Sequence, residues 1–314
     1  MKKLLFLCSL ALFIGVGSCK KNKLFKKENG QASADNQAIQ AQTDGAASDA
    51  NTAIGNYTKL SGKMNQANGI LSTNICGATI DTTGLYMGTV MINYNGTVCD
   101  NRKREGSIRL TIIDHALGKR WKDAGCVLKV DYLSYKVTRA SDGKSLKFNG
   151  THYVTNVNGG TWLNLVLNTQ PNLVHTIKGD GLSVEFEDGH TSTWNIHRQY
   201  TYTWNGSVLT CTGEGIGTYN GISSLENWGT TRDGDEFTSQ VTTPVVWNTT
   251  CGAWAPITGE VVIKVDSKFF ELKCNFGVDA SGNSVTTAPN SCPYGWKVEW
   301  KYKNKTNHKI FGYY

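Results

Sequence analysis

Cysteine is the residue type whose number and spacing in this sequence point most directly to chemistry. Nine Cys among 314 residues are many for a protein of a reducing compartment. Cys76 and Cys99 have the same separation as Cys251 and Cys274, and Cys292 follows. We predict a Cys76–Cys99 disulfide and a bridge from Cys251 to either Cys292 or Cys274, because spacing alone leaves the connectivity open. The sequence has no Cys-x-x-Cys and no clustered Cys and His, so we expect no metal and no cofactor.

Acidic side chains gather near Glu185 and come closest to a catalytic arrangement. Glu185 and Glu187 alternate along a predicted strand, and Asp188 and His190 follow in its turn. A hydrolase with paired carboxylates needs the two groups about 5–9.5 Å apart across a cleft. Alternation instead puts this pair on the solvated face of a strand. The sequence also has no Gly-x-Ser-x-Gly motif, and we expect a protein that is not an enzyme.

A row of aromatic residues is the remaining candidate for ligand binding. Tyr200, Tyr202 and Trp204 alternate along one predicted strand and therefore share a face. If exposed, the row would stack on the sugar rings of a glycan or form a protein-binding patch. If buried, it would belong to the core, which is the interpretation we favour.

The N-terminus has the features of an export signal. Residues 1–18 combine a basic start with a short apolar run and small residues, which is typical of a secretory signal peptide. The run is shorter than the roughly 20 residues of a spanning helix. Val16-Gly17-Ser18-Cys19 resembles a bacterial lipobox, which implies that Cys19 is lipidated and that its acyl chains bind the membrane. The alternative is an ordinary signal peptide that is cut elsewhere.

The segment that follows is polar and basic. Residues 29–52 have almost nothing to bury, so we predict a flexible tether over 19–72, although the Ala and Gln content permits a short helix within 33–53. Much of the net charge of +7 lies in this tether and in the signal. The remaining body is nearly neutral, so we expect no nucleic-acid partner.

The body over 73–314 shows the pattern of an all-β protein. Polar and apolar residues alternate over 107–112, 128–132 and 182–186, as in half-buried strands. Asn-Gly and Asp-Gly pairs mark predicted hairpin turns; they include Asn95-Gly96, Asp142-Gly143, Asn149-Gly150, Asp180-Gly181 and Asp188-Gly189. We predict an antiparallel β meander that forms either a sandwich or a long twisted sheet.

Two parts of the body repeat a short pattern. The matching residues are Cys76-Gly77-Ala78 with Thr83-Gly84, and Cys251-Gly252-Ala253 with Thr258-Gly259. They suggest related β modules near 73–140 and 245–314. A second register equates residues 92–94 with 274–276 and therefore Cys99 with Cys292. Chance remains the alternative for so short a match.

The stretch from Asn93 to Asp100, with Arg102, Arg104, Gly106 and Ile108 after it, resembles an uncharacterised β-rich outer-membrane lipoprotein family of Bacteroidetes-type bacteria. The resemblance implies an all-β fold and export to the outer membrane, with the periplasmic or surface face left open. It implies no catalytic residue. Thr82, in Asp81-Thr82-Thr83, also fits an O-glycosylation pattern used by some of these bacteria.

Taken together, these features predict a lipid-anchored protein of the cell envelope with a structural or binding role. The alternative is a carbohydrate-binding lipoprotein of a glycan-uptake system that would use the aromatic row.

Overall fold

The computed structural model describes residues 27–55, 57–61, 75–251, 255–265, 270–285, 292–302 and 305–313. The predicted signal peptide and Cys19 lie outside these residues. The helices are α1 (Lys27–Gly55), α2 (Thr58–Ser61) and α3 (Trp162–Val166), with the short 3-10 turns η1 (Leu85–Met87) and η2 (His115–Leu117). The strands are β1 (Ala78–Asp81), β2 (Thr89–Cys99), β3 (Arg102–Ile112), β4 (Cys126–Arg139), β5 (Ser145–Asn156), β6 (Leu173–Phe186), β7 (Thr191–Trp204), β8 (Leu209–Gly215), β9 (Gly217–Tyr219), β10 (Ile222–Thr230), β11 (Glu236–Asn248), β12 (Thr258–Val265), β13 (Phe270–Val278), β14 (Gly295–Tyr302) and β15 (Lys305–Gly312).

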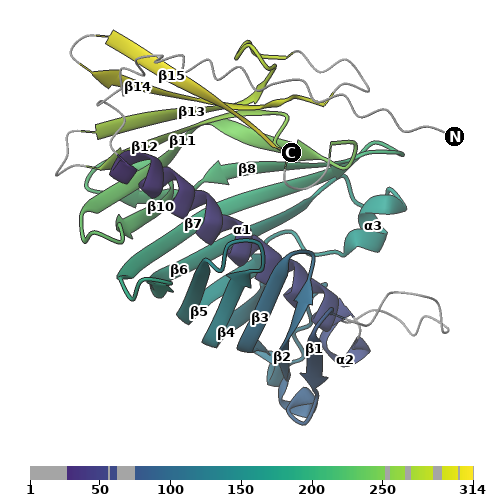
Figure 1. The fold of residues 1–314 in the computed structure, drawn as a ribbon. Coiled ribbons are helices and arrows are strands. Elements are labelled where there is room, and N and C mark those ends of the chain that lie inside the picture. Colours follow the sequence, from purple (N-terminus) through teal and green to yellow (C-terminus); the bar gives the residue numbers. More distant parts are fainter. Residues whose placement is uncertain are drawn as a thin grey trace, which may run out of the picture.

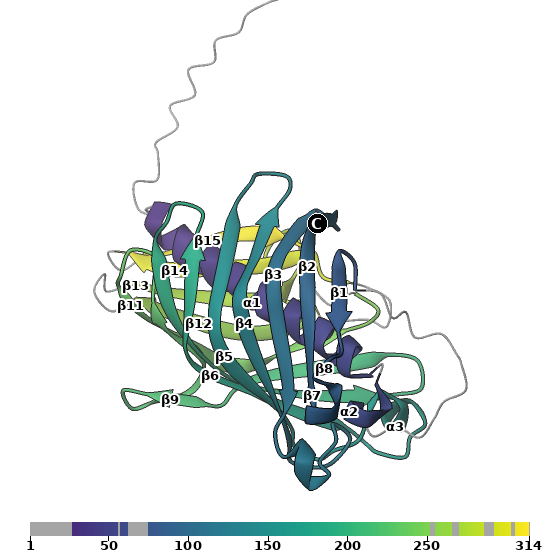
Figure 2. The same cartoon turned by 90° about the horizontal axis from the view of Figure 1, so that it is seen from below.

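All fifteen strands belong to one antiparallel sheet, and this confirms the predicted all-β fold. Neighbours in sequence are neighbours in the sheet from β1 to β7 and again from β10 to β15 (Figure 1). Of the two predicted arrangements, the structure has the long sheet. The sheet curls strongly, and α1 crosses its concave face (Figures 1 and 2).

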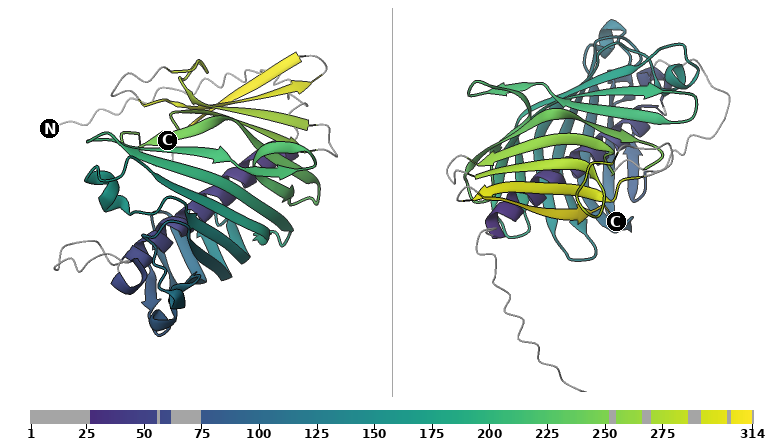
Figure 3. Two further views of the ribbon diagram at one scale, coloured as in Figure 1. Left: turned by 180° about the vertical axis from the view of Figure 1, so that it is seen from behind. Right: turned by 90° about the horizontal axis from the view of Figure 1, so that it is seen from above.

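Two strands, β8 and β10, occupy the position in the sheet between β7 and β11. β8 pairs with one half of β7 and β10 with the other half, so that Arg198 lies opposite Gly215 and Ile196 opposite Asn227. Between β8 and the paired part of β10 the chain forms the β9–β10 hairpin, which projects from the rest of the sheet (Figures 2 and 3). Gly215, at the end of β8, lies directly against Ser224 of β10. A Cβ atom added to Gly215 would be only 2.2 Å from the carbonyl oxygen of Ser224.

Several predicted hairpin turns are bulges inside long strands. Gly96, Gly150 and Gly181 have positive φ angles but lie within β2, β5 and β6. The pairing register shifts at each of these places. A bulge needs the same left-handed glycine as a tight turn. These dipeptides therefore predicted the backbone conformation correctly, but the prediction that the strands end there is wrong. Asp142-Gly143 and Asp188-Gly189 do form turns.

The predicted flexible tether is wrong for residues 27–55, which form the 29-residue helix α1. Residues of α1 recur at intervals of three or four and are buried against the sheet; they are Ile39, Thr43, Ala46, Ala50 and Ala53. The helix shares one core cluster with residues of β2 to β7. The sheet therefore supplies the apolar surface that the segment itself lacks. No helix in the described part of the chain is long and apolar enough to cross a membrane.

The strand pairing does not follow the repeated sequence pattern. Ala78 lies opposite Tyr94, whereas Gly259, which the pattern equates with Gly84, lies opposite Phe276. Thr83-Gly84 lies between β1 and β2, but Thr258-Gly259 begins β12. The duplication therefore stays a prediction.

Candidate functional site

Three aspartates of α1 each meet an arginine of the sheet, and these contacts define the candidate site. The pairs are Asp35–Arg232, Asp44–Arg198 and Asp49–Arg104. The arginines come from the β10–β11 turn, from β7 and from β3, so the pairs follow α1 across the concave face. Every Asp of the helix takes part, and the interface therefore combines an apolar stripe with charged contacts along its length.

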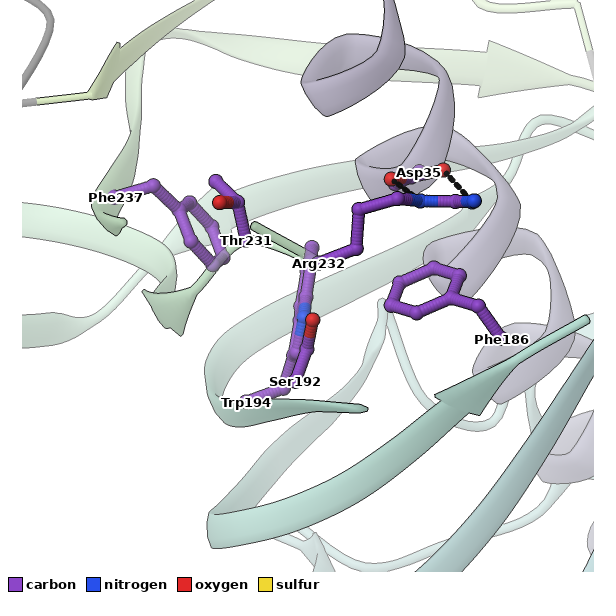
Figure 4. Close-up of a pocket in the computed structure, with 7 residues that line it drawn as sticks. All are labelled: Asp35, Phe186, Ser192, Trp194, Thr231, Arg232 and Phe237. Carbon is purple, nitrogen blue, oxygen red and sulfur yellow. Dashed lines mark hydrogen bonds and ion pairs between the residues drawn. The ribbon is translucent and has the colours of Figure 1, made fainter. Parts of the chain in front are cut away.

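Arg232 holds Asp35 at the beginning of α1. Its Nε and Nη2 atoms donate to the two carboxylate oxygens at 2.8 and 2.7 Å, as Figure 4 shows. The guanidinium lies 4.1 Å from the centre of the Phe186 ring and also donates to Asp188 at 2.9 Å. A planar guanidinium suits this bidentate contact with a carboxylate better than an ammonium group would.

A small pocket adjoins this pair (Figure 4). It is lined by Asp35, Phe186, Ser192, Trp194, Thr231, Arg232 and Phe237. The Trp194 and Phe237 rings lie 4.6 Å apart. Among the described residues, neither the Ser192 hydroxyl nor the Trp194 indole nitrogen has a hydrogen-bond partner. The pocket thus has aromatic walls and two polar atoms available for hydrogen bonds.

Arg198 lies at the centre of the interface with only 1% of its surface exposed. Its Nη2 donates to Asn227 Oδ1 at 2.6 Å, and it forms ion pairs of 3.6 Å with Asp44 and Glu226. The Tyr200 hydroxyl donates to Asp44 at 3.2 Å. Because two carboxylates flank one guanidinium, this buried cluster is not a site for an additional anion.

A chain of hydrogen bonds through Asn and Ser side chains extends the same cluster towards the helix. Asn227 donates to Asn36 Oδ1 at 3.1 Å, and Asn36 donates to Ser239 Oγ at 3.3 Å. Ser239 in turn donates to Glu226 at 2.9 Å. These groups are all buried, so their mutual contacts fix the rotation of α1 against β10 and β11.

Two further polar side chains lie beneath the helix and have no hydrogen-bond partner in the part of the chain that the structure describes. They are Tyr132, through its hydroxyl, and His152, through both ring nitrogens. Burial, followed by the positive charge of Arg198, lowers the pKa of His152 to about 4. The imidazole is therefore neutral at pH 7. In contrast, burial raises the pKa of Asp44, although Arg198 opposes the change.

Both predicted disulfides involve cysteines that the sequence singled out. Cys76 is bonded to Cys99, and Cys251 is bonded to Cys292. The alternative partner Cys274 is buried in β13 as a thiol. The first bridge ties the segment before β1 to the end of β2, and the second ties the segment after β11 to the approach to β14.

The aromatic row on β7 lies largely inside the molecule. Tyr200 is 7% exposed and contacts Asp44. Tyr202 is half-buried, with its ring 4.8 Å from that of Trp162 and 5.5 Å from that of His175. Trp204, at the end of β7, is also half-buried. Tyr200 thus belongs to the core, as favoured, whereas the row approaches the surface at Tyr202.

The other singled-out residues lie in separate places. Thr82 is half-buried in the turn after β1, and its O-glycosylation stays a prediction. Glu185 pairs with Lys147 at 3.1 Å, whereas Glu187 lies 3.4 Å from Arg232, so the two carboxylates have different partners. No group of three or more metal-ligating side chains occurs within the described ranges.

The helix-docking residues were missed by sequence reasoning. The polar composition of 29–52 pointed to a tether, and Arg104, Arg198 and Arg232 carried no recognisable motif. The available signal was the spacing of Ile39, Ala46, Ala50 and Ala53, because small residues at such intervals let a helix approach a surface closely.

No family model, curated protein or solved structure matches this chain.

Proposed function

We propose that this chain is an exported, lipid-anchored protein of the cell envelope that serves as a structural or binding protein. The disulfides Cys76–Cys99 and Cys251–Cys292 carry the proposal, because such bonds persist in oxidising compartments. They indicate an extracytoplasmic protein, and the lipobox-like residues that end at Cys19 add the anchor. We also propose that the protein lies in the outer membrane and is related to the lipoprotein family that the sequence resembles.

The state of the polar groups on the concave face supports a role other than catalysis. Arg198, Asp44 and Glu226 are engaged with one another, and α1 lies over them. A general acid or base must lie within hydrogen-bond reach of its substrate. In this structure α1 occupies the concave face and contacts these polar groups, so they are not within hydrogen-bond reach of a substrate.

Growth on labelled palmitate tests the anchor. We expect label on the wild-type protein and none on Cys19→Ala, whereas Cys8→Ala, within the predicted signal, serves as the matched control and should keep the label. Fractionation should then place the labelled protein in the outer membrane. A wild-type protein without label, or label that survives Cys19→Ala, contradicts the proposal.

A second candidate, glycan binding, is favoured by one contact. Trp162 is 37% exposed and its ring meets that of Tyr202 edge to face, so an exposed ring adjoins the aromatic row. Sugar rings stack on such surfaces. A glycan array with wild type and Trp162→Ala tests this candidate, and Tyr294→Ala, another exposed aromatic, is the control. Binding that Trp162→Ala leaves intact rejects the aromatic row as the site.

A further inference from the structure

Helix α1 contacts the sheet through side chains that differ in kind from those inside the sheet (Figure 1). The buried apolar side chains of its described residues are mostly small; they are Ile39, Ala46, Ala50, Ala53 and Ile54. Neighbouring strands bury larger side chains, such as Tyr135 and Phe148, and are joined by backbone hydrogen bonds. Since the free energy of burial grows with the apolar area, α1 gains less per residue from apolar contact than the strands do. We therefore expect α1 to open at a lower free energy than the sheet.

Polar groups beneath and along α1 favour its release. Within the described ranges, the Tyr132 hydroxyl and both ring nitrogens of His152 have no hydrogen-bond partner. Burial also raises the pKa of Asp44 and of Asp49, so both carboxylates are held in place at a desolvation cost. Water that reaches these groups when α1 leaves would hydrate them, and this hydration lowers the free energy of the open state.

The Cys76–Cys99 disulfide lies at the boundary between the helical segment and the sheet. Cys76 precedes β1 by two residues, and Cys99 is the last residue of β2, so the bond closes a loop that contains both strands. Arg104 lies at the same boundary, because it pairs with Asp49 of α1 and its Nη2 donates to the Cys76 carbonyl oxygen at 3.5 Å. A pull on the chain before Cys76 therefore passes through the disulfide to the end of β2 and does not peel β1 from its neighbour.

The order of the elements lets the helices leave without disturbing the sheet. Both α1 and α2 precede Cys76, and every strand that the structure describes follows it. Besides its own packing, α2 adds two backbone hydrogen bonds, in which Trp121 donates to Leu60 at 2.8 Å and Lys122 donates to Ser61 at 3.2 Å. Release of the two helices thus breaks these bonds and the side-chain contacts of α1, and it leaves the pairing between strands intact.

We propose that α1 and α2 form a releasable strap: the two helices undock from a sheet that stays folded, and the Cys76–Cys99 disulfide marks the point where release stops. Once undocked, α1 would not remain a rigid helix, because Gly45 and its many Asn, Ser and Thr residues lower its helix propensity and the supporting sheet is gone. The released strap is then a flexible chain.

The role of the strap rests on the proposed lipid anchor at Cys19. With the strap docked, Cys19 precedes Lys27 by eight residues and lies at most about 28 Å from it. With the strap released, 57 residues separate Cys19 from Cys76, which reach up to about 190 Å and have a root-mean-square length of about 40 Å as a flexible chain. The strap therefore sets how far the body moves from the membrane.

Hydrogen exchange of the full mature chain tests whether the strap opens by itself. Protection factors in α1 should be at least about a hundredfold smaller than those in β4 and β5, because α1 opens while the sheet stays folded. Urea should change the exchange of α1 only slightly and that of the strands strongly, since less surface is exposed when α1 leaves. If α1 and the strands have the same protection and the same urea dependence, they form one cooperative unit and the proposal is overturned.

A variant that cannot dock the strap tests the open state directly. Ala46→Lys with Ala50→Lys places two long, charged side chains where the helix meets the sheet without changing its helix propensity greatly. Its α1 amides should exchange as fast as those of an unstructured peptide, while β4 and β5 stay protected. The matched control, Ala41→Lys with Ser48→Lys, makes the same change of charge on the exposed side of α1 and should behave as wild type. A buried-side variant that unfolds, or that keeps α1 protected, overturns the proposal.

Opening the disulfide tests the point where release stops. In wild type, the amides of β1 should stay protected when those of α1 exchange. In Cys76→Ala with Cys99→Ala, β1 should lose at least about tenfold of its protection and exchange together with α1. A wild-type β1 that opens with α1, or an equally protected β1 in the double variant, overturns the disulfide as the stop.

Energy transfer on a membrane measures the reach of the strap. The acylated chain is placed on vesicles of phosphatidylethanolamine and phosphatidylglycerol, with a donor dye on Lys144→Cys, in the exposed β4–β5 turn, and acceptor dyes on the lipids. Transfer should fall at least about twofold in Ala46→Lys with Ala50→Lys and stay at the wild-type level in the control. Equal transfer in both variants overturns the role in setting distance. Palmitate labelling of the same cells reports on the anchor separately, because the exchange results hold with or without the lipid.

Discussion

Arg232 and Asp35 are 197 residues apart in sequence and share two hydrogen bonds at 2.8 and 2.7 Å. The contact fixes the beginning of α1 to the β10–β11 turn. It is the best-formed of three similar pairs, and it converts a segment with the composition of a tether into part of the folded body.

Replacing Arg232 should loosen the helix. Both side chains are mostly buried, at 13% and 10% exposed, so Arg232→Gln leaves Asp35 without its main partner and should lower the free energy of unfolding by about 1–3 kcal/mol. Arg232→Lys should recover only part of this, because an ammonium group cannot make the bidentate contact. Denaturant unfolding measures the change. Arg139→Gln, which breaks an exposed pair with Asp142, is the control and should cost under about 1 kcal/mol.

The apolar stripe of α1 should behave as core. Ile39 is 0% exposed, so Ile39→Ala should cost about 2–5 kcal/mol. Ala50 is equally enclosed, and Ala50→Leu should cost about 1–3 kcal/mol by overpacking. Ser48→Ala, on the exposed side of the helix, should be nearly neutral. If Ile39→Ala and Ala50→Leu unfold at the same denaturant concentration as wild type, α1 does not dock as described.

Two buried histidines should make the protein sensitive to mild acid. Burial lowers the pKa of His152 and of His175 from 6.5 to about 4. Between these values the unfolded chain binds more protons than the folded one, so stability is complete above pH 6.5 and falls as the pH drops towards 4. Each residue contributes up to about 3 kcal/mol. Asp44 and Asp49 act in the opposite direction, because burial raises the pKa of each, and they offset part of the loss.

Unfolding curves recorded from pH 7 to pH 4 measure this effect. His152→Gln and His175→Gln should each flatten the pH dependence, whereas the exposed His308→Gln should not change it. Histidine variants whose pH dependence between pH 6.5 and pH 4 equals that of wild type would contradict the buried neutral state of these rings.

Four cysteines should form two disulfides, and the buried thiols should react slowly with alkylating reagents. Burial raises the pKa of Cys126 to about 11 and that of Cys211 to about 12. Few thiolates are then present at pH 8, so iodoacetamide should modify both thiols slowly in the folded protein and rapidly in denaturant. Non-reducing peptide mapping should find Cys76 joined to Cys99. Rapid alkylation of Cys126 in the folded state would contradict its burial.

Removal of the first bridge should destabilise the sheet edge. Cys76→Ala with Cys99→Ala opens a loop that the disulfide closes over 23 residues, and the expected cost is about 2–4 kcal/mol. Thermal unfolding with and without reductant checks this value, since reductant should lower the wild-type midpoint and leave that of the double variant less affected. Equal midpoints for wild type and double variant in the absence of reductant would show that the bridge adds no stability.

Local patterns in the sequence were sufficient to predict the strands of the sheet but not the residues at which the strands end. Alternation over 107–112 and 182–186 matches the burial of β3 and β6. The glycine pairs marked left-handed backbone correctly, yet Gly150 and Gly181 lie in bulges, because a bulge and a turn require the same φ angle. Only the pairing with neighbouring strands distinguishes the two.

The sequence by itself determined the β character of the body and the Cys76–Cys99 pair, because the period of two and the cysteine spacing are properties of the chain alone. The tertiary structure decided the position of α1 and the choice of Cys292 over Cys274. Burial of a polar helix depends on the surface that receives it. The sequence alone suggests that the three aspartates of α1 are solvated. The fold brings an arginine from a distant part of the sheet to each of them.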